Sequence, residues 1–197
     1  MYEYADKVIR YLNRRYVRIF NKLKRKTRSL AKLDEITVLG YVTEAYTELN
    51  EITTPMLIKV AQKAYKDVNR DGTLTEMWVM GYLNIFNPTS TYIYTKDAER
   101  KKYRSYEAIM SKNAKVEAFE LAKRYWAKMV AEYAIEITDA ATLQAYKDTG
   151  VKKVVWVTEE DDRVCHTCRG REGKIYDIGK IPSKPHLGCR CYYLPVV

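Results

Sequence analysis

The pattern of apolar and polar positions predicts long helices through most of the first 150 residues. Residues 2–30 show the clearest repeat, with apolar side chains every three or four positions, which is the spacing of one helix face. These apolar positions are Val8, Tyr11, Leu12, Ile19, Leu23 and Leu30. The spacing predicts an amphipathic helix with one buried and one polar face.

Five more helices are expected before residue 150. The second should cover 34–68, with Asp34 or Thr37 as its cap and Pro55 as a kink or a split. The others are expected over 74–86, 96–110, 113–135 and 139–148, with a polar loop at 88–95. Gly150 is a natural residue to end the last of them.

The pattern changes after Gly150, where β-branched and aromatic residues replace the helical repeat. Strands are expected over 151–158, 174–178 and 190–195. We therefore predict an α+β protein: a mainly helical N-terminal body (1–150) with a basic first helix, followed by a small antiparallel β module (151–197) with a cysteine and histidine cluster.

Composition fits a globular, helix-rich chain. Hydrophobic residues make up 47% and charged residues 30% of the sequence, while glycine (8) and proline (5) are scarce. No run of 18 apolar residues occurs, and the N-terminus has no apolar secretory segment, so we expect no membrane span and a reducing cytoplasmic environment.

Positive charge is concentrated in the first helix. The net charge is +10, and residues 1–32 contribute +9 of it, with 11 Lys and Arg against 2 Asp and Glu. Like charges four positions apart repel each other unless an anion or acidic surface lies against them. We predict that this helix contacts a phosphate backbone or an acidic partner, with a solvated face as the alternative. The candidate residues are Arg10, Arg14, Arg15, Arg18, Lys22, Lys24, Arg25, Lys26 and Arg28.

All four cysteines lie between positions 165 and 191, together with both histidines. Zinc prefers four sulfur or nitrogen ligands in a tetrahedron, and pairs separated by two residues suit such a site. The five candidate ligands are Cys165, Cys168, His186, Cys189 and Cys191. The first four are the preferred set, and Cys191 could replace His186 or Cys189. A structural zinc would supply folding energy that so small a β module lacks.

Other readings of the cysteines are reduced thiols, disulfides and thiol–disulfide exchange. Disulfides are rare in a reducing compartment, and exchange enzymes place their CxxC at the start of a helix within a βαβ unit. A zinc deaminase would need His-x-Glu before Pro-Cys-x-x-Cys, and that pattern does not occur.

Several spaced elements of the last 45 or so residues resemble the phage head morphogenesis domain of the Mu F-like minor capsid proteins. They are Val155-Trp156, Asp161-x-Arg163-x-Cys165-x-x-Cys168, Gly173-Lys174, Pro182, Pro185-His186-x-x-Cys189-Arg190-Cys191 and Leu194-Pro195-Val196. The helical region before them is also similar to that family.

The resemblance implies a structural virion protein, present in few copies, that acts in head assembly. It implies a position near the portal inside the capsid, binding to portal or major capsid protein, and host cytoplasm as the location during assembly. It implies no established catalytic activity, so we expect no enzyme. The alternative hypothesis is a nucleic-acid-binding zinc protein that contacts packaged DNA through the basic first helix.

Overall fold

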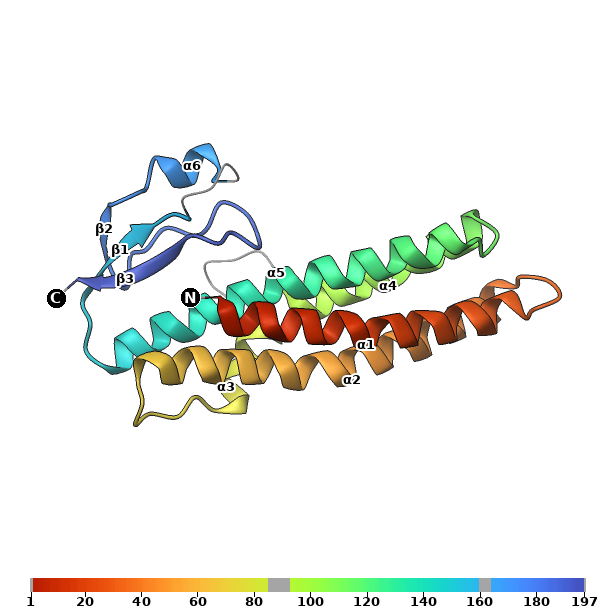
Figure 1. The fold of residues 1–197 in the computed structure, drawn as a ribbon, viewed down its shortest axis with the longest axis horizontal. Coiled ribbons are helices and arrows are strands. Elements are labelled where there is room, and N and C mark those ends of the chain that lie inside the picture. Colours follow the sequence, from red (N-terminus) through yellow and green to blue (C-terminus); the bar gives the residue numbers. More distant parts are fainter. Residues whose placement is uncertain (1, 85–92, 160–163, 197) are drawn as a thin grey trace.

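The structure, a computed structural model, describes residues 2–84, 93–159 and 164–196. Four long helices lie along one axis: α1 (Glu3–Arg28), α2 (Glu35–Val68), α4 (Tyr94–Ser111) and α5 (Val116–Asp148). The short α3 (Glu76–Asn84) follows the turn after α2 (Figure 1). The expected polar loop at 88–95 falls mostly outside the described residues, as does Phe86 at the end of the expected third helix.

Aromatic side chains fill the centre of the bundle. Trp126 of α5 is fully buried and meets the rings of Tyr16 from α1 and Tyr46 from α2 edge-on, with centroids 6.4 and 5.2 Å away. Edge-to-face contacts of this kind add to the stabilisation from burial itself. They join three helices at one point, so the long helices share a single core.

One of the expected helix boundaries was wrong. The helices expected over 113–135 and 139–148 are one helix, α5, because Ile135, Ile137 and Thr138 continue its buried face. The Thr138 hydroxyl donates to the Ala134 carbonyl and is thereby satisfied inside the helix. Pro55 does not split α2, since buried side chains hold the helix to the core on both sides of it.

Helix ends follow the expected chemistry. Asp34 caps α2, its carboxylate accepting a hydrogen bond from the Thr37 amide at 2.8 Å. Gly150 has the positive φ of +82° that ends α5, and the next amide, from Val151, donates back to the Tyr146 carbonyl.

The C-terminal residues form the expected antiparallel sheet. Its central strand β1 (Lys153–Val157) lies between β2 (Ile175–Asp177) and β3 (Tyr192–Val196). Val154, Trp156 and Tyr193 on one face are buried. The sheet lies beside the second half of α5 and the start of α1 (Figure 1), so the start of α1 comes close to the cysteine segment. The predicted boundary near 150 stays a prediction.

Candidate metal centre

The first cysteine pair lies on a single turn of helix after β1. Cys165 precedes α6 (His166–Arg169), and its carbonyl accepts the Arg169 amide at 3.0 Å. This turn carries Cys168 into the interior, where it is fully buried, while Cys165 is half-buried and His166 is exposed. The CxxC spacing therefore presents two thiols from one tight turn.

The second cysteine pair lies on the segment that enters β3. Cys189 and Cys191 are both buried, whereas Arg190 between them is exposed. Gly188 directs the chain into this segment with a φ of +75°. A β-carbon there would lie 2.9 Å from Cγ of Glu132 on α5, so only glycine lets the loop approach α5 this closely.

Three of the sulfur atoms meet. Sγ of Cys168, Cys189 and Cys191 all lie within 4.8 Å of one another, and Cys168 and Cys189 are 3.5 Å apart. In a tetrahedral zinc–thiolate site with bonds of about 2.3 Å, sulfur atoms are roughly 3.8 Å apart. The three thiols therefore fit three corners of a metal site, and they form part of the buried core of the β module.

The electrostatics of the cluster oppose thiolates that have no cation beside them. Burial raises the pKa of Cys168, and the neighbouring thiols raise it further. Burial and Cys189 likewise raise the pKa of Cys191. A divalent cation reverses this balance, because a coordinating thiol is deprotonated by the metal charge.

Cys165, like His186, lies outside this three-sulfur group and is a candidate for the fourth ligand. Burial opposes its ionisation, but hydrogen bonds from the Cys168 amide and thiol, and from His186, bring the pKa of Cys165 below its ordinary value. His186 is exposed on the loop outside the three-sulfur group, and its Nδ1 lies 3.3 Å from the Leu187 carbonyl. Cys191, which the sequence left as a substitute, is thus inside the cluster, and His186 is at its edge.

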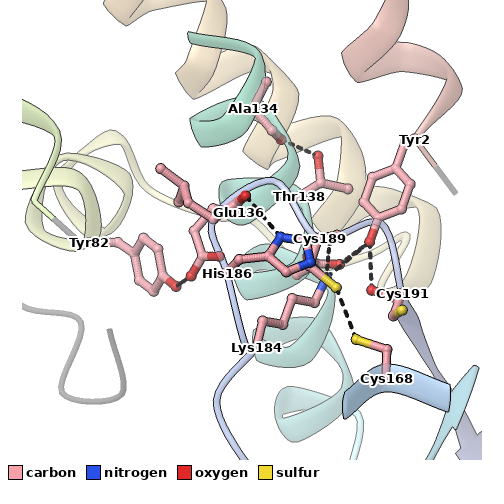
Figure 2. A network of polar contacts seen from close by, with 12 residues as sticks. Tyr2, Tyr82, Ala134, Glu136, Thr138, Cys168, Lys184, His186, Cys189 and Cys191 are labelled. Atoms are coloured by element: carbon pink, nitrogen blue, oxygen red, sulfur yellow. Dashed lines mark hydrogen bonds and ion pairs between the residues drawn. The ribbon is translucent and has the colours of Figure 1, made fainter. Parts of the chain in front are cut away.

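A buried polar network lies directly against this segment (Figure 2). The Lys184 ammonium donates to the Asp139 carboxylate of α5, to the Cys189 carbonyl at 2.8 Å and to the Tyr2 hydroxyl at 3.2 Å. The Lys184 and Asp139 side chains are only 8% and 6% exposed. A buried ion pair is tolerated only when its remaining hydrogen-bonding groups are also satisfied, as they are here.

The sequence reasoning missed this network. Tyr2 and Lys184 lie 182 positions apart, and Lys184 stands in a Pro/Ser loop that resembles any surface loop. One signal existed: Asp139 interrupts a largely apolar stretch of α5, and a carboxylate on a core-facing helix position needs a cationic partner.

A second ion pair joins the same segment to the first helix. Arg190 donates through both terminal nitrogens to the Asp6 carboxylate of α1, at 3.0 and 2.9 Å, and its guanidinium lies 5.0 Å from the centre of the Tyr2 ring. Bidentate arginine–carboxylate pairs are among the strongest hydrogen-bonded contacts. The motif arginine therefore fastens the β module to the helical body.

Seven of the nine basic candidates of α1 fall into two groups in the structure. Lys22 and Lys26 pair with Glu44 and Glu48 of α2. A second set is exposed and forms no ion pair with any residue in the described ranges: Arg10, Arg14, Arg18, Arg25 and Arg28. Arg15 lies over the Tyr11 ring, and Lys24 is half-buried. The five unpaired arginines recur on one face and are called the arginine face below.

Of the remaining motif residues, Asp161 and Arg163 lie outside the described residues. Gly173 has a φ of +71° in the turn before β2, where its amide donates to the Trp156 carbonyl at 2.9 Å. The positive φ thus explains why glycine occupies this position of the motif.

Comparisons of the chain with protein-family models, with curated proteins and with solved structures found no match. Among the residues that the structure describes, no helix combines the length and apolar character needed to cross a bilayer.

Proposed function

We propose that this chain is a structural minor capsid protein that acts in phage head morphogenesis, bound near the portal inside the head. The observation that carries the proposal is the use of the motif residues. Cys168, Cys189 and Cys191 converge to form the core of the β module, and Arg190 binds the module to α1. The motif residues thus hold parts of the protein together, as expected of a structural protein.

The proposal includes one structural zinc ion. Cys168, Cys189 and Cys191 would hold it, with Cys165 as the fourth ligand. Four thiolates from two short segments match a closed structural site, in which no position stays open for a substrate. Zinc bound there supplies the folding energy that a three-stranded sheet of 3- and 5-residue strands cannot obtain from its own burial.

Co-sedimentation tests the capsid role. The chain is expected to sediment with procapsids when it is produced together with the portal and major capsid proteins of the genome that encodes it. Production with each partner alone identifies which of them it binds. Deletion of the chain should reduce the yield of infectious heads, and normal yield and infectivity without it would reject the proposal.

Nucleic-acid binding is a second candidate function, and the arginine face favours it. Contacts to a phosphate backbone are made by lysine and arginine, and the arginine face supplies five exposed arginines. Arginine also matches phosphate with two parallel hydrogen bonds, and here the exposed positions carry arginine while the pairs with α2 use lysine. Since the opposite face of α1 is buried in the bundle, this contact would follow the DNA backbone and read no bases.

The salt dependence of DNA affinity tests this second function. Each phosphate contact adds about 0.9 to the slope of log affinity against log salt concentration. Replacing Arg10, Arg14 and Arg18 by glutamine should therefore reduce that slope by about 2.7. Lys22→Gln with Lys26→Gln is the matched control, and it should leave the slope nearly unchanged because Glu44 and Glu48 already pair with these lysines. Equal effects of the two sets would contradict a role for the arginine face.

A further inference from the structure

The segment 189–191 has two sides with different partners. Its cysteine side chains join the sulfur cluster, while its backbone carbonyls face α1 and α5. The Cys191 carbonyl lies 2.9 Å from the Tyr2 hydroxyl, and the Cys189 carbonyl accepts from Lys184 at 2.8 Å. The two cysteines of this segment that would bind metal are therefore also held through their carbonyls, by Tyr2 and by Lys184 (Figure 2).

Tyr2 is the central member of this contact. It is only 2% exposed, and its hydroxyl proton is shared between Oδ1 of Asp139 at 2.7 Å and the Cys191 carbonyl. Lys184 and Arg190 lie over its ring, with their charged groups 5.7 and 5.0 Å from the ring centre. One residue from the N-terminal end thus contacts both the body and the ligand segment.

The Arg190–Asp6 pair provides a second, independent attachment one turn further along α1. Arg190 lies between two of the proposed ligands, so its backbone position is fixed if metal binds on either side of it. The first two turns of α1 and residues 189–191, the ligand segment, consequently hold each other in place.

We propose that Tyr2, Lys184 and Arg190 are positioning residues of the metal centre, and that metal binding and the seating of the first turns of α1 stabilise each other. This inference rests on the zinc centre of the proposed function, and it adds a partner element to that site. Residues outside the ligand set that orient ligands commonly change metal affinity 10- to 100-fold when replaced. Because linkage is reciprocal, a loosened α1 must weaken metal binding by the same factor by which metal loss weakens seating.

Competition for zinc with a chelating dye, measured on the full chain, tests whether these contacts affect zinc affinity. Tyr2→Phe keeps the ring and removes the hydroxyl, and it is expected to weaken zinc binding by about tenfold. Asp6→Asn, at a partly exposed site, is expected to weaken zinc binding less but measurably. Tyr11→Phe, at an exposed position of the same helix, is the matched control and should bind zinc as the wild type does.

Amide hydrogen exchange tests whether zinc binding stabilises the packing of the first turns of α1 against residues 189–191. Removing zinc from the wild-type protein should speed exchange in residues 3–12 and leave the far end of α1 unchanged. Unchanged exchange there, together with equal zinc affinity of Tyr2→Phe and wild type, would overturn the linkage while leaving the metal centre in place. A wild-type protein that takes up no zinc would overturn the linkage and the metal centre together, and the co-sedimentation result would still decide the capsid role separately.

Discussion

Replacing Lys184 by methionine is expected to lower the free energy of unfolding by about 3–5 kcal/mol at neutral pH. The change keeps most of the length of the side chain but removes the only cation that pairs with Asp139 among the described residues, and the Asp139 side chain is 6% exposed. A buried charge without its partner is strongly destabilising, because desolvation is no longer offset. Denaturant unfolding followed by far-ultraviolet circular dichroism measures the loss.

The double variant Lys184→Met with Asp139→Asn is the matched control. Asparagine has the same shape, carries no charge and can still accept the Tyr2 hydroxyl, so most of the lost stability should return. Lys22→Met, which removes an exposed ion pair, should change stability little. A double variant as unstable as the single one would show that Lys184 acts through something other than the Asp139 charge.

The loss of stability in Lys184→Met should depend on pH in a defined direction. Burial raises the pKa of Asp139 from 3.8 to about 6, although Lys184 and the Tyr2 hydrogen bond lower it. Between these values the folded state holds a proton that the unfolded state has lost, so the contribution of Asp139 to stability falls as pH rises. Without Lys184 the pKa of Asp139 should rise further, and the variant should therefore regain stability on acidification to pH 5. A deficit of the same size at pH 5 and pH 8 would contradict this account.

Replacing Cys168 by alanine is expected to abolish metal binding and to unfold the β module while the helices remain. Cys168 is fully buried and lies 3.5 Å from the Cys189 sulfur, and the sulfurs are part of the core that packs Trp156 and Tyr193. Structural zinc contributes on the order of 10 kcal/mol to the folding of small domains, far more than this sheet obtains from burial. Hydrogen exchange should therefore become rapid in residues 153–157 and 192–196 and stay slow in α2 and α5.

Two further single variants distinguish the fourth ligand. Cys165→Ala should weaken zinc binding, because Cys165 begins the helical turn that carries Cys168 into the cluster. His186→Ala should leave the metal content unchanged, since His186 is exposed. Metal loss in His186→Ala with retention in Cys165→Ala would instead identify the histidine as the ligand.

Much of the fold could be predicted from the sequence, because the relevant signals are local. The apolar repeat in α1, the Asp34 cap and Gly150 each act within a turn or two of chain. All three are as expected, except that Tyr11 of the repeat is exposed and Leu30 lies beyond the end of α1. The wrong boundary, at 136–138, is a place where packing against other helices outweighs local preference. Such packing cannot be read from a single stretch of sequence.

The candidate site was likewise predictable from the sequence only in part. Cysteine spacing alone identified Cys168, Cys189 and Cys191 among the candidate ligands, and the fold places these three together. The attachment of this site to Tyr2, Asp6 and Asp139 depends on contacts between distant parts of the chain, which spacing does not encode. Spacing likewise could not distinguish Lys22 and Lys26, which pair with α2, from the exposed arginines beside them.

The metal content of the purified chain, measured by elemental analysis beside a thiol titration, tests the central claim most directly. The account predicts about one zinc per chain, with the cysteine thiols protected until a chelator is added and with no zinc in Cys168→Ala. A metal-free protein whose thiols react freely while residues 153–157 and 192–196 stay protected from exchange would contradict it.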